Sequence, residues 1–254
     1  MNDINIRPVI LAGGLGTRLH PRTLHLPKPL LPINGRPLLW YALNLLNRVD
    51  IKRPIVSIAY LSNLIKAYFE REDVTFMEFT GCSMAETMIR ISETDDSFSF
   101  LGLSSDVLIT NDAVDIILQD YINSNYNNSV LFTKLPIPGH KKWEFRIENG
   151  FLTDIIVRET KTNFERILLI LSKDSLTRIR KFLGESISES SLPKELINYQ
   201  TGWTLLLKVL TILNIKIHAR IIELPIWNIN TPNDFGGAEK FVKENIELFG
   251  SFQP

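Results

Sequence analysis

The stretch LAGGLGTRLHPRTLHLPKPLLPI, residues 11–33, gathers three glycines, four prolines and three cationic side chains, and it holds no acidic residue. It directly follows the apolar residues 8–10, which are typical of a buried strand. Glycines allow backbone N–H groups to approach anionic oxygens, arginine donates paired hydrogen bonds to phosphate, and lysine supplies a compact charge. On spacing alone, the stretch is consistent with a phosphate-binding turn and equally with a surface loop whose cations are solvated.

Two well-known phosphate-binding motifs do not match this turn. A Walker A loop needs Gly-Lys followed by Ser or Thr, whereas Gly16 precedes Thr17 and Arg18. The dinucleotide fingerprint G-x-G-x-x-G is half present, because Leu19 stands where the third glycine is required. The sequence therefore argues against a P-loop enzyme and against a dehydrogenase.

Short apolar runs alternate with amphipathic segments in the first half of the chain. We expect strands at residues 7–11, 54–59, 74–79 and 98–103, and helices at 37–48, 62–71 and 84–92. This alternation predicts an α/β fold with a Rossmann-like, mostly parallel sheet flanked by helices. Ligands bind such sheets beyond the carboxyl ends of the strands, where both the glycine turn and the SSD sequence at 104–106 fall.

The second half of the chain has a different pattern. Asn149-Gly150, between two alternating runs, predicts a type I′ hairpin and hence a small antiparallel insertion in the sheet. We expect further strands at residues 129–134, 166–172 and 216–224, and helices at 174–183, 204–213 and after Pro232.

Composition and charge exclude several classes of function. Lys plus Arg and Asp plus Glu both number 28, so no global field points to nucleic acid or to a membrane surface. Cys82 is the only cysteine, which excludes an intrachain disulfide and is consistent with a reducing compartment. The N-terminus lacks an apolar signal-peptide segment, and the most apolar helix candidate, 204–215, is too short to span a bilayer. We therefore expect a cytoplasmic protein that binds neither nucleic acid nor membranes.

Residues 11–43, LAGGLGTRLHPRTLHLPKPLLPINGRPLLWYAL, resemble the signature of the sugar-phosphate nucleotidyltransferases, the NDP-sugar pyrophosphorylase family. The family pattern runs L-A-G-G-x-G-T-R-L, then P-x-T, P-K-P-L-L-P and G-K-P, and Arg36 replaces its last lysine. The resemblance implies transfer of a nucleoside monophosphate from an NTP to a sugar 1-phosphate or similar small phosphorylated acceptor, with release of pyrophosphate and with Mg²⁺ as cofactor. It also implies one domain over residues 1–254, with a nucleotide-binding half (1–124) and an acceptor-binding half (125–254).

The resemblance assigns the nucleotide phosphates to the glycine turn. It implies nucleotide contacts at Leu11, Ala12, Gly13, Gly14, Gly16, Thr17 and, more weakly, Gly81. Arg18 would stabilise the pyrophosphate leaving group and Lys28 would contact the phosphates at the reacting centre, so these two are the expected catalytic residues. Because both stand in a loop rich in glycine and proline, we expect their side chains to reach solvent.

Two further stretches resemble the metal-binding parts of the family. FLGLSSDVLI resembles a strand that ends in Gly-Asp, which implies that Asp106 binds the metal. WNINTPNDF resembles W-x-D-I-G-T-P-x-D and puts Asn228 where a second metal-binding aspartate is usual. Taken alone, an aspartate at a strand end is more often a turn or cap residue, and Thr231-Pro232 also predicts the start of the last helix. Asp234 is the alternative second ligand.

The acceptor half departs from the family pattern. In LTDIIVRETK, Glu159 matches the sugar-contacting acid, but Thr160 replaces the phosphate-binding lysine and Lys161 comes one residue late. Ordinary hexose 1-phosphates are therefore expected to bind weakly. Two alternative functions stay open, namely cytidylyl transfer to a phosphorylated alcohol and a non-catalytic regulatory or scaffold role on the same fold. Family members commonly form dimers or tetramers, so the resemblance also allows a homo-oligomer.

Overall fold

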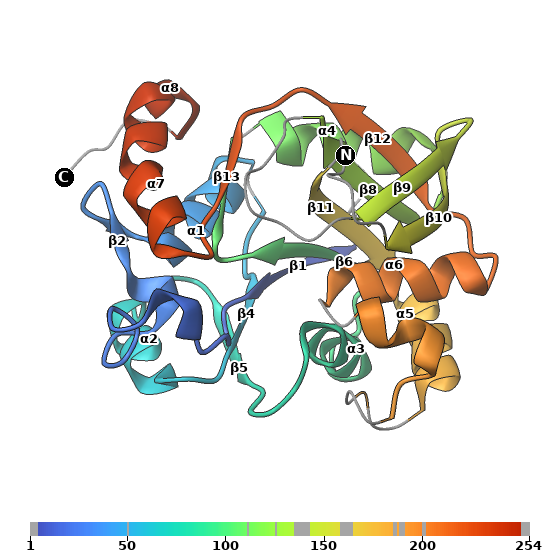
Figure 1. Ribbon diagram of the computed structural model, residues 1–254, viewed down its shortest axis with the longest axis horizontal. Helices are drawn as coiled ribbons and strands as arrows, with labels where there is room; N and C mark the ends of the chain where they lie inside the picture. The colour runs from blue at the N-terminus through green and yellow to red at the C-terminus, as the bar shows by residue number, and fades with distance from the viewer. Residues whose placement is uncertain are drawn as a thin grey trace. The chain divides into compact units, whose positions relative to one another are not determined.

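The computed structural model describes residues 5–249, apart from 50, 111, 125, 135–142, 158–164, 185–186, 188–190 and 200–201. The chain forms two compact units (Figure 1). We call one the signature unit, because it contains the glycine turn, and the other the second unit. The signature unit comprises Pro8–Thr80, Leu103–Asp115 and Leu224–Pro254, and the second unit comprises Met1–Arg7, Gly81–Gly102 and Ile116–Glu223.

The signature unit is built on three parallel strands in the order β5-β4-β1. These are β1 (Ile6–Leu11), β4 (Ile55–Ile58) and β5 (Thr75–Glu78). All four residues of β4 are buried, which is the expected result for an apolar strand in the interior of a parallel sheet. The carboxyl end of β1 leads directly into the glycine turn, so the turn lies where ligands bind in α/β sheets.

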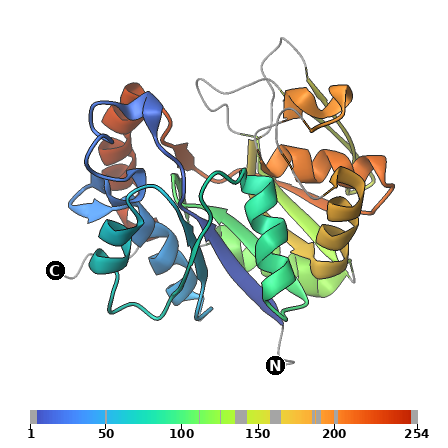
Figure 2. The same ribbon diagram turned by 90° about the horizontal axis from the view of Figure 1, so that it is seen from below.

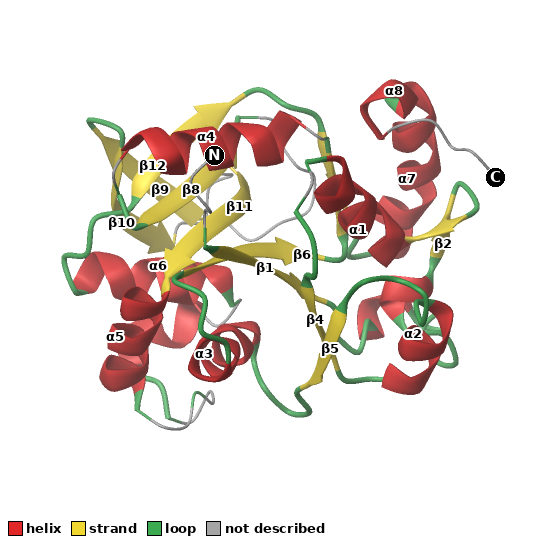
Figure 3. Cartoon of the chain, turned by 180° about the vertical axis from the view of Figure 1, so that it is seen from behind, coloured by secondary structure: helices red, strands yellow, loops and turns green. Residues whose placement is uncertain are grey.

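Helices and short strands complete the signature unit (Figure 3). The helices are α1 (Leu38–Arg48), α2 (Ser62–Tyr68), α7 (Pro232–Glu244) and α8 (Ile246–Phe249). The short strands are the antiparallel pairs β2 (Pro32–Ile33) with β3 (Arg36–Pro37), and β7 (Val107–Ile109) with β13 (Ile226–Asn228). One apolar core joins α1 and α7 to the segment after the glycine turn and to β7; its members include Leu31, Leu38, Leu108, Phe241 and Val242.

The second unit has a mixed sheet in the order β6-β11-β8-β12-β10-β9. Its strands are β6 (Ser99–Ser104, whose last two residues belong to the signature unit), β8 (Asn128–Thr133), β9 (Trp143–Glu148), β10 (Phe151–Val157), β11 (Glu165–Ser172) and β12 (His218–Ile222). β12 pairs with β8 in parallel, whereas β11 pairs antiparallel with β6 and β8, and β10 pairs antiparallel with β12 and β9. Asn149 and Gly150 both have positive φ, 52° and 79°, and connect β9 to β10 as the predicted hairpin.

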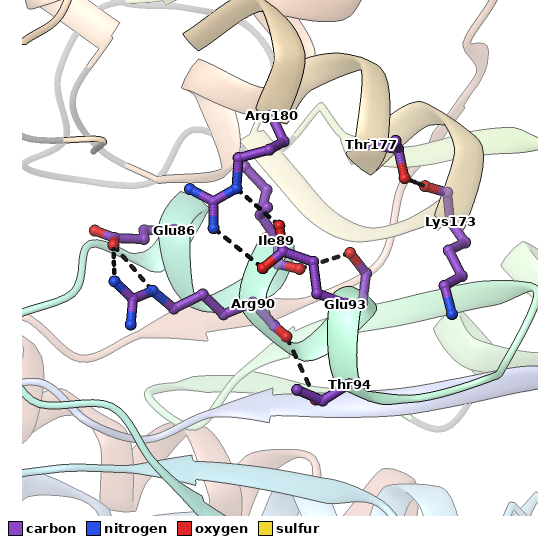
Figure 4. A network of polar contacts seen from close by, with 9 residues as sticks. Glu86, Ile89, Arg90, Glu93, Thr94, Lys173, Thr177 and Arg180 are labelled. Carbon is purple, nitrogen blue, oxygen red and sulfur yellow. Dashed lines mark hydrogen bonds and ion pairs between the residues drawn. The ribbon is translucent and has the colours of Figure 1, made fainter. Parts of the chain in front are cut away.

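Three helices of the second unit pack together, namely α3 (Met84–Thr94), α5 (Lys173–Leu183) and α6 (Trp203–Ile212) (Figures 1 and 2). The unit also includes most of α4 (Asp112–Ser124) and a 3₁₀ segment at Lys194–Tyr199. Figure 4 shows the polar contacts between α3 and α5, where Arg180 Nε donates to Glu93 Oε1 over 2.8 Å. Within α3, Arg90 Nη2 donates to Glu86 Oε1 over 2.7 Å, one helical turn away. Partly exposed pairs of this kind contribute about 0–1 kcal/mol each, so buried apolar contacts supply most of the stability of this packing.

The predicted fold class is confirmed, because the chain has an α/β fold with flanking helices, a Rossmann-like parallel part in β5, β4 and β1, and antiparallel strands in the second unit. The short strands β2, β3, β7 and β13 were not expected from the sequence, because two or three residues show no measurable periodicity. That the chain is one domain with halves 1–124 and 125–254 stays a prediction.

Adjacent glycines in α7 provide a test of how tightly this helix packs. A Cβ on Gly237 would lie 2.4 Å from Trp227 Cζ2, whereas no atom lies within 4 Å of a Cβ on Gly236. We expect Gly237→Ala to lower the free energy of unfolding by about 1–3 kcal/mol through overpacking. Gly236→Ala, the matched control, should raise it by up to about 1 kcal/mol because alanine is the better helix former. Urea unfolding of both variants measures the difference, and equal effects would contradict this packing.

Candidate functional site

The glycine turn begins at a backbone that neighbouring strands hold in place. Ala12 N–H donates to Ser57 O over 2.9 Å, and Ser105 N–H donates to Leu11 O over 3.1 Å. Leu11 and Ala12 are both buried, so they anchor the turn. Beyond them the chain reaches the surface at Gly14, where a Cβ would meet nothing within 4 Å. An anion can therefore approach the backbone of this part of the turn.

The second part of the turn folds onto itself and requires glycine at position 16. Gly16 has φ 65°, and a Cβ there would lie 3.0 Å from Thr23 Cγ2 and 3.2 Å from Lys28 Cβ. Thr23 is fully buried, and its Oγ1 donates to Gly16 O over 2.8 Å. The single 3₁₀ turn Thr17–Leu19 follows, with Leu19 N–H donating to Gly16 O over 2.8 Å. Thr17 and Arg18 are thereby presented at the surface.

Lys28 lies in the interior, contrary to the expectation that it reaches solvent. Only 9% of the residue is exposed, and its Nζ lies 2.6 Å from Asp106 Oδ2. The flanking prolines, Pro27 and Pro29, are buried as well, so the backbone carries the lysine into the unit. A buried ammonium needs an anionic partner to offset the loss of its hydration, and Asp106 supplies it.

Asp106 and Asn228 lie on neighbouring strands. Asp106 directly precedes β7, and Asn228 ends β13 opposite Val107. Ile229 N–H donates to Asp106 O over 2.9 Å, which continues this pairing. The two proposed metal-binding residues, far apart in the sequence, are therefore adjacent in the fold.

Arg18 reaches the same strand end. It is exposed, and its Nη2 donates to Asn230 Oδ1 over 2.7 Å. Asn230 Nδ2 in turn donates to Asn228 Oδ1 over 2.7 Å. The signature unit thus brings together Arg18, Lys28, Asp106 and Asn228. Asn230 belongs to this group, and sequence reasoning missed it, because nothing in the local sequence indicates a contact with a residue 212 positions away.

Asp234 has a structural role at the start of α7. Its Oδ2 accepts hydrogen bonds from Asn230 N over 3.0 Å and from Thr231 N over 2.8 Å. Thr231 Oγ1 accepts from Asp234 N over 3.3 Å, which completes a capping box. These contacts favour a helix cap over a metal ligand for Asp234, and they fix the backbone of the segment that holds Asn228 and Asn230.

The structure assigns neither Gly81 nor Glu159 to this group. Gly81 lies in the second unit, where it is exposed and has φ 77°, just before the N-cap of α3 at Ser83. Glu159 lies outside the described residues. Next to Gly81, burial raises the pKa of the Cys82 thiol, and the nearby Glu86 carboxylate raises it further, so the thiol is a poor nucleophile at neutral pH.

Few side chains of the described residues are placed to bind a metal ion. Over the part of the chain that the structure describes, no group of three or more His, Cys, Asp and Glu side chains could hold a metal ion. Asp106 with Asn228 offers one carboxylate and one amide oxygen, and both are ligands that Mg²⁺ accepts. Within those same residues, no helix is both long and apolar enough to cross a membrane.

Residues 7–145, more than half of the chain, match the family described as Nucleotidyl transferase. The chain belongs to the nucleotidyl transferase family. This confirms the family resemblance seen in the glycine turn, and the match includes Arg18, Lys28 and Asp106.

Curated relatives of this nucleotidyl transferase family member match it over short segments. Glucose-1-phosphate cytidylyltransferase of Salmonella typhimurium is 42% identical over 76 residues, which cover 28% of this chain and 30% of the relative. D-glycero-alpha-D-manno-heptose 1-phosphate guanylyltransferase of Campylobacter jejuni is 40% identical over 67 residues, covering 26% and 30%. The matched segments thus span less than a third of these relatives.

Solved structures are similar over nearly the whole chain. A UDP-glucose pyrophosphorylase complexed with UDP-glucose has a TM-score of 0.75 at 14% identity, covering 94% of this chain and 99% of the other. The inositol-1-phosphate CTP transferase of T. maritima has 0.74 at 15% identity, covering 93% and 96%. The CTP:phosphocholine cytidylyltransferase of Streptococcus pneumoniae has 0.68 at 19% identity, covering 93% and 99%. At these identities the similarity establishes a shared fold.

The burial of Lys28 generates a prediction that separates it from Arg18. Lys28→Met keeps most of the side-chain volume but leaves Asp106 without its cation, so we expect the free energy of unfolding to fall by about 1–3 kcal/mol. Arg18→Ala removes an exposed side chain and should change it by less than about 0.5 kcal/mol. Urea unfolding of the two variants measures both values. A Lys28→Met variant as stable as the wild-type protein would show that the ion pair contributes nothing.

Proposed function

We propose that this chain transfers a nucleoside monophosphate from an NTP to a sugar 1-phosphate, releases pyrophosphate and depends on Mg²⁺. The observation that supports this most is the meeting of Arg18, Lys28, Asp106 and Asn228 beside the glycine turn, in a chain of the nucleotidyl transferase family. One strand end thus has cationic side chains, which bind phosphate, and oxygen ligands, which bind a metal. Such a site suits the complex of a metal ion with a nucleoside triphosphate.

The reaction needs charge neutralisation and alignment more than it needs a protein nucleophile. An oxygen of the acceptor phosphate attacks the α-phosphorus, and the bond from the α-phosphorus to the bridging oxygen of the β-phosphate breaks. The glycine-turn backbone and Arg18 would hold the triphosphate so that pyrophosphate leaves in line with the attack. Asp106 and Asn228 would hold Mg²⁺, which when bound would neutralise phosphate charge.

We infer that the Lys28–Asp106 ion pair couples metal binding to nucleotide binding. Without nucleotide, Lys28 neutralises Asp106 at 2.6 Å and competes with any cation for that carboxylate. With a metal–NTP complex bound, Lys28 would contact phosphate and Asp106 would contact the cation, so neither residue would be left without an opposite charge. Asn228, as a neutral amide, adds a ligand without adding charge.

The acceptor is proposed from the sequence of the second unit. Glu159 would contact the sugar, while Thr160 supplies no cation for the acceptor phosphate. Loss of one charge-assisted contact weakens binding of a hexose 1-phosphate by about ten- to a hundredfold. This departure favours, as a second candidate, cytidylyl transfer to a phosphorylated alcohol, and the similar Streptococcus pneumoniae structure is a phosphocholine cytidylyltransferase. The retained Arg18, Lys28 and Asp106 favour an enzyme over a scaffold protein.

Three further properties belong to the same proposal. We propose that the protein acts in the cytoplasm, forms a homo-oligomer and has no nucleic-acid partner. These properties are consistent with NTP-dependent synthesis of a small molecule. The balanced charge of 28 basic and 28 acidic residues and the single Cys82 support the first and third of these.

The test is a thermal-shift screen of ATP, CTP, GTP, UTP and dTTP with Mg²⁺, followed by a pyrophosphate-release assay. The assay uses sugar 1-phosphates and phosphocholine as acceptors. We expect at least one NTP to raise the melting temperature, and pyrophosphate release to need both acceptor and metal. Arg18→Ala should lower kcat by about 100-fold or more, the scale for losing a donor to the developing charge.

Arg22→Ala is the matched control in the same turn, because the Arg22 guanidinium stacks 4.7 Å from the Phe235 ring centroid. It should retain kcat within about twofold, since surface substitutions outside the site have small effects. Failure of every NTP to stabilise the protein, or equal losses in both arginine variants, would contradict the proposed function.

A further inference from the structure

Asn230 lies between the arginine of the glycine turn and the amide at the end of β13. Its Oδ1 accepts from Arg18 Nη2 over 2.7 Å, and its Nδ2 donates to Asn228 Oδ1 over 2.7 Å. Both ends of the side-chain amide are therefore engaged. In the family pattern D-I-G-T-P this position is glycine, so this chain has an additional side chain here.

The two contacts leave one orientation for the Asn230 amide. A guanidinium has donors and no acceptor, so Arg18 must face Oδ1, and Nδ2 must then face Asn228. The backbone of Asn230 is fixed separately, because its N–H donates to Asp234 Oδ2 within the capping box of α7. The amide thus projects from an anchored backbone, and its oxygen is held toward the arginine.

Arg18 needs such a partner more than Lys28 does. It is exposed, and a long cationic side chain on a surface loop samples many rotamers in water. Ligand binding restricts such a side chain to one rotamer, and the lost conformational entropy weakens binding. A side chain that is already held in place loses less entropy. The hydrogen bond that Arg18 donates to this anchored amide oxygen restricts the positions of the guanidinium.

We propose that Asn230 is a positioning residue for Arg18, which it orients toward the pyrophosphate leaving group; this rests on the proposed function. The Asn230 side chain accepts from Arg18, so we expect its effect on pyrophosphate to pass through the arginine. Its contact with Asn228 Oδ1 holds the Asn230 amide in the orientation that this requires.

A double-mutant cycle tests this proposal. Asn230→Ala, Arg18→Ala and the double variant are compared for kcat, for the KM of the NTP and, by calorimetric titration, for the dissociation constant of inorganic pyrophosphate. We expect Asn230→Ala to lower kcat and to weaken pyrophosphate binding by about five- to tenfold, or about 1.0–1.4 kcal/mol, with KM changed less. In the Arg18→Ala background the same substitution should change nothing further.

Asn233→Ala is the matched control, since Asn233 is an exposed asparagine three positions along the chain. It should behave as the wild-type protein. Additive losses in the double variant, or an Asn230→Ala variant with wild-type kcat and pyrophosphate affinity, would overturn the proposal. If the wild-type protein shows no transfer with any NTP, the proposed function fails, and the pyrophosphate titration alone tests the positioning role of Asn230. In that case, wild-type pyrophosphate binding that Asn230→Ala weakens only when Arg18 is present supports the positioning role. Absence of wild-type pyrophosphate binding overturns it.

Discussion

The ion pair between Lys28 and Asp106 is the constraint on which the rest of the site depends. Its two members come from the segment after the glycine turn and from the residue before β7, and they meet at 2.6 Å with the lysine buried. An ammonium buried without an anion would be costly, so the pair fixes how these two segments lie in the signature unit. Asp106 O accepts from Ile229 N, which extends the same arrangement to Asn228 and Asn230.

Much of the fold and part of the site could be predicted from local sequence. The apolar run before the glycines predicted the strand β1, which ends at the glycine turn, and Asn149-Gly150 predicted the β9–β10 hairpin. The burial of Lys28 was missed because the composition of its segment is that of a surface loop, while its partner is 78 positions away. The contact between Arg18 and Asn230 was missed for the same reason, since long-range partners are set by the pairing of β7 with β13. Those strands have three residues each, too few for a periodic pattern.

The two compact units differ in how closely their sequences follow the family pattern. The glycine turn, Arg18, Lys28 and Asp106 lie in the signature unit and follow the family pattern. Thr160, in the sequence of the second unit, departs from it. The similar proteins are named for cytidylyl and guanylyl transfer and for different phosphorylated acceptors.

Binding of Mn²⁺ in place of Mg²⁺, followed by electron paramagnetic resonance, tests most directly whether Lys28 and a metal compete for Asp106. The wild-type protein is titrated without nucleotide and with a non-hydrolysable NTP analogue, beside Lys28→Met and a double variant that adds Asp106→Asn. The account predicts that the wild-type protein binds Mn²⁺ weakly without nucleotide and more tightly with it. Without nucleotide, Lys28→Met should bind Mn²⁺ about tenfold more tightly than the wild-type protein, because a competing unit charge has been removed. The double variant should lose that gain. Equal Mn²⁺ affinity of the wild-type protein and Lys28→Met in the absence of nucleotide would contradict the account.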